Sequence, residues 1–369
     1  MQIHPVPRPP ARDAAPHPLV HAAVHVEDAV EFDQYGHHDF ADTARSRTVR
    51  LFGSEQSESH LWVALPDGVD PDTCAPEEGL AMASVRLPLQ EDTDKADVHV
   101  VTHPAHRSQG HAKALMSAVS HLLHERGRTT WIAYAFSPGP EATGPDAIPA
   151  RTGSGAVDGR RPAHRWLQAE GFTLEQCERP STLVLDDVAF ARAEELAAGA
   201  RRAAPAASGY ELLSWSDATP AGHLDGMAWL VSRMSTDVPN GDLGFDEQVW
   251  DAERLLAGEE RVRAAGIHWV LTAARHRGTG QLVAFTRFEW PEENPAGVWQ
   301  EETLVLAEHR GHRLGTLVKA ANLPRLLEVN PAARRVHTWN AAENRWMLAI
   351  NDALGFVPVG LEGAWQKKL

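Results

Sequence analysis

The stretch EHRGHRLG, Glu308 to Gly315, combines residue types that suit the binding of an anion. Arg310, His312 and Arg313 are cationic or can become so, in a chain with 35 basic and 50 acidic residues. The stretch follows the apolar run TLVL and precedes TLVKAANLPRLLE, a pattern that predicts a strand, a turn and a helix. The first amide N–H groups of such a helix lack partners and lie at the positive end of its dipole. The pattern therefore indicates a site for a phosphate or diphosphate.

A second copy of this arrangement lies earlier in the chain. DVHVVTHPAHRSQGHAKAL, Asp97 to Leu115, aligns without gaps on QEETLVLAEHRGHRLGTLV, Gln300 to Val318. Each copy is followed by a helix, a short strand, another helix and a Gly-Phe turn ending at Phe172 or Phe356. Strands and helices that alternate in the same order twice predict an α/β architecture with two similar domains in tandem.

The composition fits a soluble protein with a packed core. The 369 residues are 43% hydrophobic and 23% charged, with a net charge of −15 that argues against a general nucleic-acid binder. Cys74 and Cys177 stand far apart without metal-ligand spacing, so we expect neither a zinc site nor a disulfide framework. No run of about 18 apolar residues suits a membrane span. We expect a cytoplasmic protein with no metal; the oligomeric state stays open.

Changes in composition along the chain suggest where the domains begin and end. The expected order is a proline-rich disordered arm (1–18), a first domain (19–190), an Ala-rich helical linker (191–208) and a second domain (209–369). A stretch rich in Gly, Pro and Ser (137–161) is expected to form a mobile surface loop within the first domain.

The turn motif narrows the class of phosphate ligand. It lacks the GK[ST] of a nucleoside triphosphate loop, and it lacks the spacing of GxGxxG. It resembles instead the [QR]xxGx[GA] signature of the GNAT acyltransferase superfamily, whose members bind the pyrophosphate of acetyl-CoA at such a turn. Arg107 to Ala112, RSQGHA, satisfies this signature, whereas Arg310 to Gly315, RGHRLG, departs from it with Arg313 at the glycine position.

The resemblance is to tandem GNAT proteins of the kind that includes mycothiol synthase. It implies an α/β fold in which each domain has a mixed, mostly antiparallel sheet flanked by helices, and it implies acetyl-CoA or another acyl-CoA as cofactor. In such folds the strand before the turn is splayed from its neighbour, so that its backbone binds the pantetheine arm. By resemblance this role falls on Thr303, Leu304 and Val305, and in the first half on Val100, Val101 and Thr102.

The resemblance also assigns the residues that would hold the rest of the cofactor. The pyrophosphate turn of the second half comprises Arg310, Gly311, His312, Arg313, Leu314, Gly315 and Thr316. Its counterpart in the first half comprises Arg107, Ser108, Gln109, Gly110, His111, Ala112 and Lys113. We expect Gly311 and Gly315 to let a diphosphate approach the backbone. Asn340 and Asn344 stand where family members place an asparagine near the cofactor, and both could instead cap the following helix.

The chemistry of acyl transfer points to Glu302. An attacking amine must lose a proton, and family members commonly use a carboxylate on the cofactor strand as the base. Glu302 stands there, Glu301 is expected on the opposite face by strand alternation, and His99 is the equivalent of Glu302 in the first half. Many members protonate the leaving thiolate with a tyrosine four residues before the Gly-Phe turn. Asn351 and Leu167 occupy those positions and cannot act as that acid.

These residues predict an acetyl-CoA-dependent N-acetyltransferase that acylates a primary amine of a small molecule, with the second domain catalytic. The missing tyrosines favour an alternative, a non-catalytic acyl-CoA-binding or sensing protein. An acidic stretch, Met234 to Leu256, forms either a wall of the acceptor site or a solvated loop and helix; its carboxylates include Asp237 and Asp242.

Overall fold

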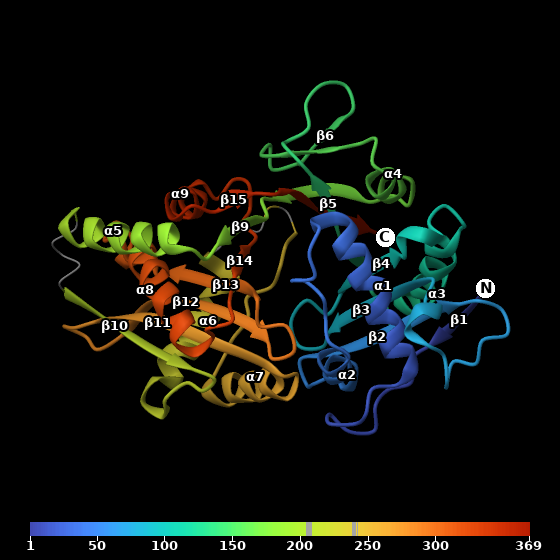
Figure 1. Cartoon of the computed structure of the whole chain (residues 1–369), viewed down its shortest axis with the longest axis horizontal. Helices are drawn as coiled ribbons and strands as arrows, with labels where there is room; N and C mark the ends of the chain where they lie inside the picture. The colour runs from blue at the N-terminus through green and yellow to red at the C-terminus, as the bar shows by residue number, and fades with distance from the viewer. Residues whose placement is uncertain (204–208, 238–240, 242) are drawn as a thin grey trace. The chain divides into compact units, whose positions relative to one another are not determined.

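The chain folds into two compact units, each built on its own sheet (Figure 1). A computed structural model describes residues 1–203, 209–237, 241 and 243–369. The N-terminal unit comprises Met1–Cys177, Ala264–Gly266 and Leu361–Leu369, and the C-terminal unit comprises Glu178–Arg263 and Ile267–Gly360.

The sheet of the N-terminal unit has the strand order β1-β2-β3-β4-β5-β16-β8 among the described residues. Its strands are β1 Gln2–Pro5, β2 Ser57–Leu65, β3 Ala81–Pro88, β4 Lys95–Thr102, β5 Thr130–Pro138, β8 Thr173–Glu178 and β16 Gly360–Lys368. Its helices are α1 Pro18–Tyr35, α2 Ala44–Phe52, α3 His111–Glu125 and α4 Pro162–Ala169. The pairs from β1 to β4 are antiparallel, and β4 pairs in parallel with β5.

The sheet of the C-terminal unit repeats this plan over the described strands, in the order β10-β11-β12-β13-β14-β9-β15. Its strands are β9 Ser181–Val184, β10 Tyr210–Ser216, β11 Ile267–His276, β12 Leu282–Pro291, β13 Gly297–Val305, β14 Arg335–Thr338 and β15 Val357–Pro358. Its helices are α5 Asp187–Ala203, α6 Leu224–Asp237, α7 Ala252–Ala264, α8 Leu314–Val329 and α9 Arg345–Leu354. Antiparallel pairs again precede one parallel pair, β13 with β14. The predicted mixed, mostly antiparallel sheets are confirmed.

The division of the chain differs from the predicted domain boundaries. The segment expected as a linker, 191–208, lies largely in α5, while residues 204–208 fall outside the described part of the chain. Ala189, Ala193, Ala197 and Ala200 recur every three or four residues and are buried in the core of the C-terminal unit. The alanine-rich helix is therefore a core element, because its small side chains let α5 pack closely on α8.

The C-terminal end of the chain also departs from the predicted boundary of 209–369. β16 lies between β5 and β8, so Leu361–Leu369 belongs to the N-terminal unit. Conversely, β9 lies between β14 and β15 and completes the sheet of the C-terminal unit. Each sheet therefore includes a strand from the other half of the sequence.

Two segments expected to be irregular contain strands. The predicted arm, 1–18, begins with β1, which pairs along β2 from Gln2 opposite Leu65 to Pro5 opposite Trp62. A proline is tolerated there because β1 is an edge strand. The loop 137–161 contains a short antiparallel pair, β6 Ala147–Pro149 with β7 Ala156–Asp158. No helix among the described residues is long and apolar enough to cross a membrane.

Candidate cofactor and transfer site

The two predicted phosphate turns share one backbone conformation. In the N-terminal unit a short 3₁₀ turn, Pro104–His106, leads to Ser108 and Gly110 at φ 63° and 86°, and α3 starts at the next residue. In the C-terminal unit the 3₁₀ turn Ala307–His309 leads to Gly311 and Arg313 at φ 84° and 59°, and α8 starts at Leu314. The gap-free alignment of the two turns is thus matched by their backbones.

Both helices begin with open N-termini. No side chain of the described residues caps α3 or α8. A Cβ added to Gly110 or Gly311 would meet no atom within 4 Å, so the space beside each turn is free. Unpaired amide N–H groups facing open space can receive an anionic group. The residues present therefore fit a pyrophosphate.

The first arginine of each turn is engaged by a carboxylate. Arg107 Nη1 donates to Asp33 Oδ2 at 2.8 Å, from the end of α1. Arg310 lies 3.7 Å from Asp237, the last residue of α6, and its Nε donates to the carbonyl of Val305. This arginine therefore ties the turn to the end of α1 in the N-terminal unit and to the end of α6 in the C-terminal unit. Asp237 thus pairs with Arg310, while Asp242 of the same acidic stretch lies outside the described residues.

The remaining turn residues divide into exposed and buried groups. The side chains of Gln109, Lys113 and Arg313 are exposed, those of Ala112, His312 and Thr316 are partly exposed, and those of His111 and Leu314 are buried. Gly315 is also buried, and a Cβ there would lie 3.2 Å from Ile350 Cδ1 and 3.7 Å from Val305 Cγ2. Gly315 therefore lets α8 pack against β13 and α9, whereas the expectation was that it would make room for phosphate.

The strand before each turn parts from its parallel neighbour. β13 pairs with β14 only from Gly297 to Trp299, although β13 continues to Val305. β4 pairs with β5 only from Lys95 to Asp97, and continues to Thr102. The backbone of Thr303 to Val305, and that of Val100 to Thr102, has no ladder partner on this side among the described strands. Such an edge can accept an extended ligand as an added strand.

A β-bulge distinguishes the C-terminal strand. Thr286 pairs with Thr303 and Phe288 pairs with Gln300, so Arg287 of β12 faces both Glu301 and Glu302. The alternation that predicted Glu301 on the opposite face is interrupted at this point. The Gln300 side chain enters the bulge, where its Nε2 donates to the carbonyl of Arg287 at 2.7 Å.

Charges gather at the bulge. Arg287 forms an ion pair with Glu289 and lies over the ring of Trp269, 4.7 Å from its centroid. The pKa of Glu301 is raised to about 8, first by desolvation in the surrounding protein, although part of the side chain is accessible to solvent, and then by the negative charges of Glu289 and Glu302; the positive charge of Arg287 opposes this rise. The bulge therefore brings the carboxyl groups of Glu289, Glu301 and Glu302 close to a single guanidinium group, that of Arg287.

The two asparagines have different roles. Asn344 caps α9, because its Oδ1 accepts from the amide of Met347 at 3.3 Å. Asn340 does not cap that helix; its Oδ1 accepts from Asn351 Nδ2 at 2.5 Å. Of the two readings left open by the sequence, capping therefore holds for Asn344, and Asn340 Nδ2 has no hydrogen-bond partner within the described part of the chain.

Comparison with solved structures identifies the architecture. A tandem GNAT protein from the clavulanic acid biosynthesis pathway, in a structure without AcCoA, matches with TM-score 0.70 and 23% identity, covering 100% of this chain and 98% of that one. A GCN5-related N-acetyltransferase from Sphaerobacter thermophilus matches with TM-score 0.57 and 15% identity, covering 99% and 95%. No family model and no curated protein matches the sequence.

The chain has the tandem GNAT fold. The predicted architecture is confirmed over its whole length. The finer likeness to mycothiol synthase stays a prediction.

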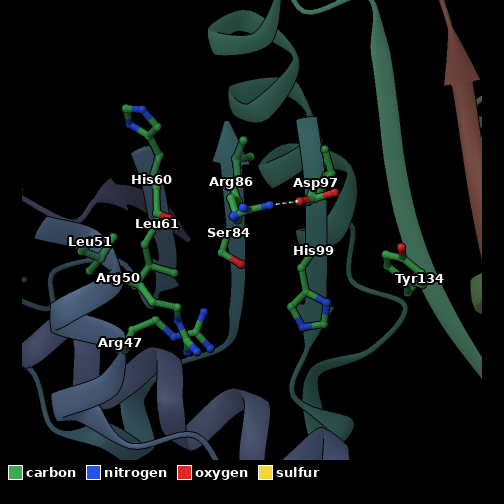
Figure 2. Close-up of a pocket in the computed structure, with 13 residues that line it drawn as sticks. Arg47, Arg50, Leu51, His60, Leu61, Ser84, Arg86, Asp97, His99 and Tyr134 are labelled. Carbon is green, nitrogen blue, oxygen red and sulfur yellow. Dashed lines mark hydrogen bonds and ion pairs between the residues drawn. The ribbon is translucent and has the colours of Figure 1, made fainter. Parts of the chain in front are cut away.

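The N-terminal GNAT unit contains a cavity of about 160 Å³ beside its regular strand β4. Figure 2 shows Arg47 and Arg50 of α2 directed into it, with His99 of β4 nearby. His99 Nε2 lies 3.4 Å from Glu27 Oε1. Burial raises the pKa of Glu27, but Arg47 and His99 outweigh it and hold that pKa well below its usual range. The two guanidinium groups share Asp42, so charge in the cavity is largely matched.

Sequence reasoning missed two residues of the C-terminal GNAT unit. The position of Arg287 opposite Glu301 and Glu302 depends on how β12 pairs with the bulged strand β13, which the sequence does not reveal. Lys319 is 1% exposed in the middle of α8. A signal for it was available, because Lys319 is the one charged residue within the apolar run LGTLVKAANL.

Proposed function

We propose that the protein is an acyl-CoA-dependent N-acyltransferase that acylates a primary amine of a small molecule, with the C-terminal unit performing the transfer. The observation that carries the proposal is the sequence of features along β13. A carboxylate bulge, a free strand edge, a left-handed turn and an uncapped helix follow one another within Glu301 to Leu314. The solved structures with the same fold include a GCN5-related N-acetyltransferase.

The residues that would hold acetyl-CoA in this unit are those of β13 and the following turn. The backbone of Thr303, Leu304 and Val305 would bind the pantetheine arm, and the amides from Gly311 to Thr316 would bind the pyrophosphate. When bound, the cofactor supplies an activated acyl thioester. The N-terminal turn, Arg107 to Lys113, has the same backbone and would bind a second acyl-CoA.

Glu302 would take the proton of the attacking amine. An alkylammonium group has a pKa of about 10.4, so a base must generate the neutral nucleophile at neutral pH. The bulge places Glu302 next to Glu301, whose pKa is raised to about 8. Because Glu301 holds its proton up to about pH 8, we assign the role of base to Glu302, which faces Arg287 across the bulge.

The test is to incubate the full chain with acetyl-CoA and a panel of amines, and to measure the release of free thiol. Amide ¹⁵N–¹H resonances of Gly311 and Gly110 report binding to each unit separately. We expect the Gly311 resonance to shift and at least one amine to increase thiol release.

The alternative, a non-catalytic acyl-CoA-binding protein, is favoured by Asn351 and Leu167 at the tyrosine positions. Binding at Gly311 without amine-dependent thiol release would support that alternative. If acetyl-CoA shifts neither the Gly311 nor the Gly110 resonance, the cofactor assignment is wrong.

A further inference from the structure

Lys319 is a buried cation without an acidic partner among the described residues. Its side chain is 1% exposed within α8, and its Nζ donates to Asn351 Oδ1 at 2.6 Å. The ring of Phe356 lies 5.7 Å from Nζ. Burial lowers the pKa of Lys319 from 10.5 to about 7. Burying a lysine in this way costs stability that an apolar residue at the same position would not cost.

Lys319 fixes the direction of a hydrogen-bond chain. The ammonium form of Lys319, which prevails below about pH 7, can only donate, so in that form the oxygen of Asn351 must face Lys319 and its Nδ2 must face away. That Nδ2 donates to Asn340 Oδ1 at 2.5 Å. The oxygen of Asn340 is therefore engaged, and the group that Asn340 can offer to a ligand is its Nδ2 donor.

Asn340 stands where the C-terminal sheet opens. It follows β14 by two residues, and its backbone carbonyl accepts from the amide of Arg179 at 2.7 Å, which holds it in place. β13 and β14 pair in parallel with Gly297 opposite Arg335. Continuing that register past the last pair puts Asn340 level with Glu302, across the gap between the strands.

We propose that Lys319 is a positioning residue of the C-terminal site: acting through Asn351, it turns the Asn340 amide so that Nδ2 donates to an oxygen of an acyl-CoA bound along β13. This inference rests on the proposed function. It adds one buried group to the site, since Lys319 itself is 1% exposed and acts only through its hydrogen bond to Asn351.

The N-terminal unit supplies a natural contrast. The residue equivalent to Lys319 in the turn-and-helix alignment is Met116, and the residue equivalent to Asn351 is Leu167; both are buried. The same fold thus accepts an apolar pair at these positions. Lys319→Met and Asn351→Leu are accordingly the substitutions that remove the hydrogen bonds of Lys319 and Asn351 with the least disturbance of packing.

The test is a double-mutant cycle read by the Gly311 resonance during titration of the full chain with acetyl-CoA. Lys319→Met and Asn340→Ala should each weaken binding about tenfold, the usual cost of one hydrogen bond. Because both act through one donor, Lys319→Met/Asn340→Ala should bind no more weakly than either single variant. A merely structural lysine would give independent effects that multiply.

Each remaining outcome is decisive. Unchanged affinity in Lys319→Met, or a double variant about a hundredfold weaker, would overturn the inference while leaving acyl-CoA binding intact. A parent whose Gly311 resonance does not respond would overturn the proposed function, and this inference with it. If Lys319→Met does not fold, Lys319→Met/Asn351→Leu takes its place, because this pair removes the buried Asn351 oxygen together with the lysine that donates to it.

Discussion

The two GNAT units of this chain share a cofactor-type turn and differ beside it. Both turns have two left-handed residues, an uncapped helix and an arginine paired with an aspartate. The strands before them differ, because β13 carries a bulge whereas β4 pairs with β3 without a register shift from Ala81 to Arg86. The turns, which the two units share, suit the binding of one class of ligand. The bulge, which only β13 has, lies where a bound acyl group would react.

The two units also differ in the buried residues that follow the turn. The C-terminal unit carries Lys319 and Asn351 where the N-terminal unit carries Met116 and Leu167. At the position of Glu302 the N-terminal unit has His99, held by Glu27. These differences agree with the proposal that the C-terminal unit performs the transfer and that the N-terminal unit binds acyl-CoA.

Among the predicted effects, the largest difference between the two units should come from replacing Glu302 by glutamine. Glu302→Gln keeps size but loses basicity, so turnover should fall on the order of 10²-fold with cofactor affinity nearly unchanged. His99→Gln should have little effect, and Glu293→Gln, an exposed glutamate after β12, is the matched control. The measurement is a pH-rate profile with an accepted amine, and raising the pH should recover part of the loss. A dead His99→Gln with an active Glu302→Gln would move catalysis to the N-terminal unit.

Stability of the C-terminal unit should depend on pH through Lys319. Its pKa is about 7 when folded and near 10.5 when unfolded, so between these values the unfolded chain binds more protons. The free energy of unfolding should therefore rise with pH above 7, by about 1 kcal/mol per pH unit, and be independent of this group below 7. Urea unfolding of the parent and of Lys319→Met between pH 7 and 9 gives the difference. Parallel curves for the two proteins would mean that Lys319 keeps an ordinary pKa.

Gly315→Val should destabilise the C-terminal unit by about 1–3 kcal/mol, because even a Cβ at this position would come within 3.2 Å of Ile350. Ala112→Val is the matched change in the N-terminal unit. It starts from a residue that already has a Cβ and is partly exposed, so its cost should stay within about 1 kcal/mol. Chemical unfolding of each variant measures the two costs. Equal costs would show that Gly315 is not a packing residue.

Local patterns made part of this molecule predictable. A strand, a turn and a helix start are set by neighbours in sequence, so the two turns and their register were accessible from Asp97 to Leu115 and Gln300 to Val318 alone. The splay of β13 was expected through the resemblance. The alanine spacing of α5 was visible as well, but an alanine-rich helix is also typical of a linker, and burial against α8 decided the matter.

Other features depend on residues distant in sequence. The bulge at Glu301 and Glu302 exists only relative to Arg287 on the partner strand, so alternation alone misplaced Glu301. The exchange of β9 and β16 between the sheets follows from strand pairing that no local pattern records. The role of Asn344 as a cap was one of two possibilities until its contact with Met347 was seen.

The smallest predicted effect concerns Arg313, a residue other than glycine at a left-handed position. Its φ of 59° corresponds to 86° at Gly110, the equivalent position of the N-terminal turn. Arg313→Gly should therefore stabilise the C-terminal unit by up to about 1 kcal/mol through relief of backbone strain, and Gly110→Arg should destabilise the N-terminal unit by a similar amount. If the exposed guanidinium of Arg313 attracts the pyrophosphate, the same Arg313→Gly change should also weaken acetyl-CoA binding and reduce its dependence on salt. Thermal unfolding measures the effect of backbone strain on stability. Titration with acetyl-CoA at two ionic strengths, followed by the Gly311 resonance, measures the contribution of the Arg313 charge to binding. A less stable Arg313→Gly would mean that the arginine makes contacts worth more than the strain it costs, and an unchanged salt dependence would limit the role of Arg313 to the backbone.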